Sequence, residues 1–168
     1  MSASAVQPSA FEPALPVDEP LQYLTFLAAH EMFAVNTLSV REIIEYNQVT
    51  AVPMMPVFMR GVINLRGSVV PVVDLRARFG KGTTVLGSRT CIVILDAASE
   101  GEAQVLGVVV DSVSEVIEIQ DVDIKPAPAF GNRIRTDFIK GMTKVRGEFV
   151  TLLQIEQVLC VDELAGQM

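Results

Sequence analysis

One pattern of residues occurs twice in this chain, and the repeat limits the folds open to it. A shift of 73 residues lays residues 39–53 over residues 112–126, with seven of fifteen positions identical, and a shift of 80 lays residues 58–67 over residues 138–147. Two copies of one β-rich unit predict two similar small barrels related by an approximate two-fold axis. Because the two shifts differ by seven residues, we place an insertion in residues 130–137.

The second half of each copy is typical of a hairpin. Apolar runs lead into and out of Arg66-Gly67, where the glycine supplies the positive φ that a tight turn needs. Pro71 has no N–H to donate, so we expect the outgoing strand to lie at a sheet edge or a bulge, and a free edge to be a docking place. A structural role in the hairpins of the two copies is assigned to Gly61, Gly67, Gly141, Arg146 and Gly147.

Short β-rich runs continue along most of the chain. Strands are expected at residues 21–27, 32–35, 62–65, 69–73, 91–95, 105–110, 113–119, 139–145 and 149–153. The first twenty residues hold four prolines, three acidic residues and no Lys or Arg, a composition that cannot form a packed core. The expected division is a disordered tail at 1–20, a first barrel at about 21–80, a Gly-rich connector at 80–88, a second barrel at about 89–155, a closing helix at 154–160 and a tail at 161–168.

Composition and residue spacing argue against several classes of protein. The net charge is −7 with no basic cluster, which disfavours a nucleic-acid surface. No apolar run approaches the roughly 18 residues that span a bilayer, so we expect a cytoplasmic protein. Cys91 and Cys160 lie in apolar surroundings at no motif spacing and are predicted to be buried free thiols. His30 is the only histidine and falls in a turn, and Asp74 and Asp111 are expected to cap turns, so neither catalysis nor a metal site is predicted.

The first hairpin also resembles a known family. The segments Gly61-Val-Ile-Asn-Leu-Arg-Gly67 and Val70-Pro-Val-Val-Asp-Leu-Arg76 closely resemble the signature of the CheW family, the adaptors that tie bacterial chemoreceptors to their histidine kinase. Further segments follow in the family's order at residues 22–26, 40–44, 107–111, 124–128 and 138–141, so the resemblance covers about residues 21–160. It implies a mostly β fold of two pseudo-two-fold-related, SH3-like, five-stranded barrels side by side, with a short C-terminal helix.

The resemblance implies a function as well. The chain is then a non-catalytic adaptor, without a cofactor, that couples the cytoplasmic tips of chemoreceptors (methyl-accepting chemotaxis proteins) to the regulatory domain of a CheA-type histidine kinase at membrane receptor arrays. The alternative is a CheW-like coupling module of another two-component pathway, in twitching motility or surface sensing. The family's receptor contacts fall in this sequence on Val40, Glu42, Arg66, Val113 and Val116, and the repeat adds Ile43 as the counterpart of Val116, so these six residues are the expected receptor-binding set. No residue is assigned to the kinase contact.

The charged members of this set have two interpretations. Arg66 recurs as Arg146 in the second copy, and Glu42 recurs as Glu115. Duplication favours a role in the fold, such as a guanidinium that supports the turn. The family resemblance favours a contact with a partner. Both interpretations stay open at the level of sequence.

The apolar members of the set are related by the repeat. Val40 and Ile43 of the first copy correspond to Val113 and Val116 of the second. If an approximate axis runs between the barrels, these four side chains line one groove from opposite sides, and such a groove suits an apolar helix. Val113 and Val116 are equally consistent with core positions.

Overall fold

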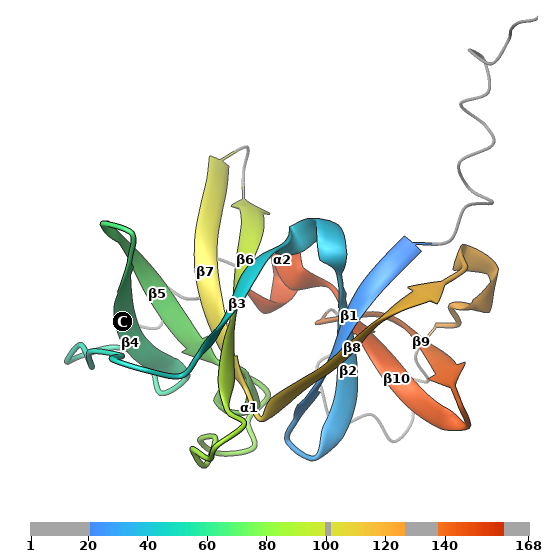
Figure 1. Cartoon of the computed structure of the whole chain (residues 1–168), viewed down its shortest axis with the longest axis horizontal. Coiled ribbons are helices and arrows are strands. Elements are labelled where there is room, and N and C mark those ends of the chain that lie inside the picture. The colour runs from blue at the N-terminus through green and yellow to red at the C-terminus, as the bar shows by residue number, and fades with distance from the viewer. Residues whose placement is uncertain (1–20, 100–101, 127–137, 160–168) are drawn as a thin grey trace, which may run out of the picture.

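The computed structural model describes residues 21–99, 102–126 and 138–159, and these form a mostly β protein (Figure 1). Ten strands make two five-stranded sheets, as expected for the fold class. The strands are β1 (Leu21–Ala28), β2 (Glu31–Asn36), β3 (Val40–Glu45), β4 (Met59–Leu65), β5 (Ser68–Asp74), β6 (Cys91–Ser99), β7 (Glu102–Val110), β8 (Ser112–Ile119), β9 (Ile139–Val145) and β10 (Glu148–Leu153). The short helices are η2 (Thr37–Ser39), α1 (Leu75–Arg78), η3 (Asp121–Asp123) and α2 (Ile155–Val158).

The two sheets have the same internal order. One runs β3-β6-β7-β5-β4 and the other β8-β1-β2-β10-β9. The strands that the repeat pairs, β3 with β8, β4 with β9 and β5 with β10, therefore occupy matching places. The remaining places are filled by two hairpins, β6-β7 in one sheet and β1-β2 in the other. The expected insertion at residues 130–137, the tail at 1–20 and the end of the chain from residue 160 lie outside the described residues.

The division of the chain between the two sheets differs from the expected one. We expected residues 21–80 in one unit, but β1 and β2 join the sheet of β8, β9 and β10. Strand β1 pairs antiparallel with β8, and β2 pairs in parallel with β10. The physical reason is that each repeated copy supplies only three strands and needs a hairpin to complete its sheet. The β6-β7 hairpin completes the first copy, which leaves the N-terminal hairpin to complete the second.

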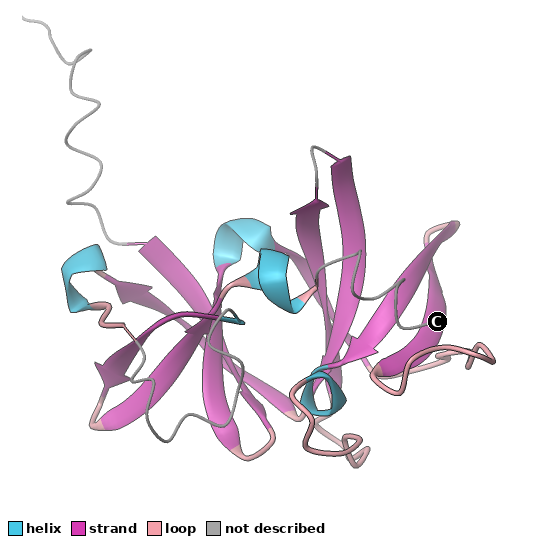
Figure 2. Cartoon of the chain, turned by 180° about the vertical axis from the view of Figure 1, so that it is seen from behind, coloured by secondary structure: helices cyan, strands magenta, loops and turns pink. Residues whose placement is uncertain are grey.

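Alternating side chains divide the core into three clusters. On β6, Val93 and Leu95 face a central cluster shared by both sheets, whereas Ile92 and Ile94 face a second cluster inside their own sheet. The other sheet has its own inner cluster as well. Strands with both faces buried carry consecutive apolar residues, which explains the β-branched runs of the sequence. The helices α1 and α2 place apolar side chains in the central cluster, between the sheets (Figure 2).

Pro71 is expected to lie in an edge strand or at a bulge, but β5 as a whole is not an edge strand. Strand β5 lies between β7 and β4, and the edges of that sheet are β3 and β4. Pro71 is tolerated because the parallel ladder between β5 and β7 begins only at Val72. The part of β5 that precedes Val72 has no ladder partner on the β7 side, so the two strands diverge there (Figure 1).

Asp74 caps α1, as its sequence position suggests, and it also anchors the following loop. Its Oδ1 accepts the backbone N–H of Ala77 at 3.3 Å and the hydroxyl of Thr84 at 2.7 Å. Its Oδ2 accepts the backbone N–H of Thr84 at 2.8 Å and Nε of Arg60 at 3.1 Å. The carboxylate is fully buried. Four donors therefore satisfy one buried charge, and they fix residues of the Gly-rich connector against the sheet.

Candidate protein-binding surface

The two edge strands of each sheet are joined by one short bridge. In the first sheet, the chain beyond β3 crosses to β4, where Thr50 and Val62 exchange two backbone hydrogen bonds of 2.9 Å. In the second sheet, Lys125 and Met142 make the equivalent exchange at 2.8 and 2.7 Å. In each sheet, the segment that follows one edge strand is thus hydrogen-bonded to the other edge strand.

A glycine of the edge strand contacts each of these bridging segments closely. A Cβ atom added to Gly61 would lie 2.0 Å from the carbonyl oxygen of Thr50, and one added to Gly141 would lie 2.9 Å from that of Lys125. Gly61 also has φ of 146°, which L side chains rarely adopt. These contacts account for Gly61 and Gly141 without any partner, although at Gly141 a side-chain methyl of Ile124 would lie closer still, at 2.5 Å. Gly67 and Gly147, with φ of 89° and 85°, have open space around them and serve the turns instead.

The arginine before each turn glycine is also in a left-handed conformation. Arg66 has φ of 53° and Arg146 has φ of 51°. Positive φ at both central residues is the type I′ geometry, which matches the twist of two-residue hairpins. A left-handed arginine is unusual because its Cβ crowds the backbone. The guanidinium makes an interaction that offsets part of that strain.

That interaction is a two-pronged ion pair with the opposite edge strand. Arg66 donates from Nη1 to Oε2 of Glu42 at 2.5 Å and from Nη2 to Oε1 at 2.9 Å. Arg146 makes the same paired contact with Glu115 on β8. The sequence shows that the glutamate and the arginine both recur, but it does not show that each arginine contacts the glutamate of its own copy. The sequence feature that could have indicated this contact is the recurrence of Glu and Arg together, at shifts of 73 and 80 residues.

The ion pair leaves its arginine largely in solvent. The side chain of Arg66 is 73% exposed, and that of Glu42 is 26% exposed. The hydrogen bond from Arg66 lowers the pKa of Glu42, and the same bond raises the pKa of Arg66. Arg146 lowers the pKa of Glu115 in the same way. Arg66 is therefore held in place and remains open to a partner, so a structural and a binding role are compatible.

Removing Arg66 is expected to raise the pKa of Glu42 and leave that of Glu115 lowered. In an Arg66→Gln variant the charged donor is lost, whereas Arg146 still holds Glu115. A carboxyl with a depressed folded pKa stabilises the fold above its unfolded pKa, and that contribution disappears as the pH falls through the folded value. Carboxyl resonances followed by NMR from pH 7 to pH 2 measure both groups. An unchanged Glu42 titration would show that the pair does not form in solution.

The apolar candidates lie on the strand faces that point toward the central cluster. A regular strand puts residues three apart on opposite faces. A bulge between Val40 and Glu42 changes this, and Val40 and Ile43 pair with Leu95 and Val93, both members of the central cluster. Val40 packs against that cluster, while Ile43 is 42% exposed.

The matching strand β8 shows the same arrangement. An irregular register pairs Val116 with Leu24 and Val113 with Phe26, again two members of the central cluster. Val113 packs against the cluster, and Val116 is 53% exposed. The structure thus brings Glu42 and Arg66 together and orients the four apolar side chains toward the space between the sheets. That these four form one groove stays a prediction.

Chemistry beyond binding has few candidates in the described part of the chain. His30 lies exposed in the β1–β2 turn, as its sequence position suggests. Residues 21–99, 102–126 and 138–159 contain no group of three potential metal ligands and no helix that is long and apolar enough to cross a membrane. Cys91 is a free thiol, as predicted, but it is half-buried rather than buried, and Cys160 lies outside the described residues.

Comparison with known proteins gives consistent matches. Residues 22–163 match a family described as CheW-like domain. The chain is 33% identical to the chemotaxis protein CheW of Klebsiella aerogenes, over 86% of this chain and 84% of that protein. It is 32% identical to the chemotaxis protein CheW of Rhizobium meliloti, over 84% of this chain and 89% of that protein. The crystal structure of scaffolding protein TtCheW from Thermoanaerobacter tengcongensis matches with a TM-score of 0.73 and 31% identity, covering 83% of this chain and 92% of that one.

Proposed function

The chain belongs to the CheW family of chemotaxis scaffolding proteins, and on that premise we propose that it couples the cytoplasmic tip of a chemoreceptor to the regulatory domain of a CheA-type histidine kinase. The family is non-catalytic, so the protein acts by binding two partners and fixing their geometry. A small movement of the receptor then biases the kinase between two activity states through differential contacts. Individually weak contacts suffice because linked binding sites raise the effective concentration of each partner.

Two exposed features carry the proposal, an ion pair at the first hairpin turn and apolar side chains on the edge strands β3 and β8. Arg66 presents a guanidinium to solvent in a fixed orientation, supported by Glu42. Ile43 on β3 and Val116 on β8 offer apolar surface toward the space between the sheets. An amphipathic helical tip binds through apolar side chains and charged groups. We assign the receptor contact to these residues.

Replacing Arg66 with glycine is expected to weaken coupling while the fold is retained. Glycine adopts the φ of 53° without strain, so the turn survives the loss of the guanidinium. Loss of one charge-assisted contact at a partner interface reduces apparent affinity about ten-fold or more, equivalent to about 1.4 kcal/mol. The measurement is kinase autophosphorylation in a mixture of receptor fragments and CheA-type kinase, with and without this protein.

Arg146→Gly is the matched control, because Arg146 occupies the same turn position and makes the same ion pair in the other sheet. We expect it to keep coupling and cooperative unfolding. Equal losses in the two variants would restrict both arginines to a structural role. If the wild-type protein binds the kinase's regulatory domain but gives no stimulation with chemotaxis receptors, the coupling belongs to another two-component pathway, such as twitching motility or surface sensing.

A further inference from the structure

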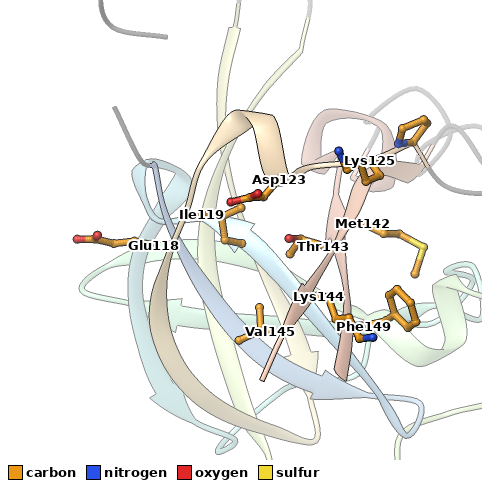
Figure 3. Close-up of a pocket in the computed structure, with 10 residues that line it drawn as sticks. Glu118, Ile119, Asp123, Lys125, Met142, Thr143, Lys144, Val145 and Phe149 are labelled. Atoms are coloured by element: carbon orange, nitrogen blue, oxygen red, sulfur yellow. The ribbon is translucent and has the colours of Figure 1, made fainter. Parts of the chain in front are cut away.

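An apolar groove lies at the β9 edge of the second sheet. It has a volume of about 640 Å³ and is formed by the end of β8, the residues after η3, and the edge strand β9 (Figure 3). Its floor and wall are apolar, with Ile119, Met142, Val145 and Phe149 among the lining residues. Phe149 is 65% exposed, which is unusual for a large aromatic side chain.

The chain enters the described structure beside this groove. Strand β1 begins at Leu21, and Leu21 is paired in register with Ile119, which lines the groove. Leu21 also packs against the same inner cluster as Val145. The twenty residues that precede Leu21 therefore connect directly to the groove's rim. An extended polyproline-type segment advances about 3.1 Å per residue, so the ten residues before Leu21 reach about 31 Å.

Those preceding residues have the composition of a groove ligand. Residues 11–20 read Phe-Glu-Pro-Ala-Leu-Pro-Val-Asp-Glu-Pro, with Pro13 and Pro16 at the P-x-x-P spacing of polyproline ligands. Phe11 and Leu15 supply apolar side chains, and the segment has three acidic residues and no basic one. A polyproline segment loses little conformational entropy on binding because it is already extended.

The groove is lined by two lysines and two carboxylates, and the lysine side favours an acidic occupant. Figure 3 shows Lys125 and Lys144 on the side of Met142 and Phe149, with Glu118 and Asp123 on the opposite side. The amino group of Lys144 lies 5.5 Å from the Phe149 ring centre, so apolar and cationic surface are adjacent there. An acidic segment with apolar side chains that lies along the β9 side therefore places its carboxylates near the lysines and its apolar side chains on Met142 and Phe149.

We propose that residues 11–20 of this chain dock in the groove between η3 and β9, as an extended polyproline-type segment. The segment then covers Met142 and Phe149, and its acidic residues face Lys125 and Lys144. The docked tail competes with any other protein for this face of the second sheet. The proposal does not depend on the coupling function, because it concerns only contacts within the chain.

The test compares NMR spectra of the full chain with those of a Phe11→Ser, Leu15→Ser double variant. We expect the resonances of Met142, Lys144 and Phe149 to shift when the two anchors are removed, at every protein concentration. A Val6→Ser variant, outside the docking segment, is expected to leave those resonances unchanged. Identical groove resonances in the wild-type chain and the double variant would overturn the proposal. Shifts that grow with protein concentration would also overturn it, because a second copy of the chain would then occupy the groove.

A reciprocal change on the groove side completes the test. Phe149→Ser is expected to move the resonances of residues 11–17 toward those of an unbound peptide. Val69 is the control position. It corresponds to Phe149 in the first copy, at a shift of 80 residues, and it is likewise exposed, at 70%. Val69→Ser is therefore expected to leave the tail resonances unchanged. If both variants moved those resonances equally, the tail would have no preference for this groove, and the proposal would fail.

Discussion

Gly61→Ala is expected to lower the free energy of unfolding by about 3 kcal/mol or more, because two separate costs combine at this position. The new methyl carbon would lie 2.0 Å from the carbonyl oxygen of Thr50 and 2.7 Å from its carbonyl carbon. Backbone atoms cannot move aside as a flexible side chain can. The φ of 146° is in addition a conformation that alanine rarely adopts. Relief of the clash requires breaking the Thr50–Val62 bridge, and with it the link between β3 and β4.

Urea unfolding followed by circular dichroism measures this loss, and Gly67→Ala is the control. Gly67 also has a positive φ, of 89°, but a Cβ there meets no atom within 4 Å. Its replacement is expected to cost only the conformational strain, about 1–2 kcal/mol. If Gly61→Ala were no more destabilising than Gly67→Ala, the strand crossing would not be the reason for glycine at position 61.

Asp74→Ala is expected to cost about 3–5 kcal/mol, the range for removing one partner from a buried ion pair. Its carboxylate is fully buried, and the side chain of Arg60 is only 21% exposed. Without Asp74, three further donors from Ala77 and Thr84 lose their acceptor as well. Donors left unsatisfied in a buried site carry the full cost of desolvation.

Two measurements separate the global and the local part of this effect. Thermal unfolding gives the loss of stability, and hydrogen exchange at the amide of Thr84 reports whether the connector detaches from the sheet. Asp96→Ala is a matched control, because Asp96 pairs with Arg41 at 3.5 Å and both side chains are about half exposed. Exposed pairs contribute at most about 1 kcal/mol. Equal destabilisation by the two variants would contradict the proposed role of Asp74.

The repeat predicted the sheets' shared architecture, because both copies retain the residues that the hairpins require. Gly61 and Gly141 recur since the same strand crossing lies above each of them. The repeat did not predict that β1 and β2 belong to the sheet of β8, β9 and β10. Their partners β8 and β10 are distant in sequence, and local patterns do not specify which of two similar sheets a hairpin completes.

The sequence pointed to individual residues of the candidate site, but it did not show how they lie relative to one another. Glu42 and Arg66 stood out because both recur, but their contact across the sheet edges depends on tertiary structure. Val40 and Ile43 are three residues apart, so strict alternation would separate them, and only the bulge puts both on one face. The groove beside Phe149 had no sequence signal, because its lining residues come from three separate segments.

The sharing of strands between the sheets has a consequence for the order in which the protein is assembled. Strands β3 to β7 follow one another in the chain and complete a sheet by themselves, whereas β1 and β2 must wait for β8 to β10. A ribosome therefore releases the first hairpin long before its partners exist. During that interval its apolar side chains, among them Phe26 and Phe33, lack the sheet that later buries them. The β1–β2 hairpin is thus made before the three strands that complete its sheet.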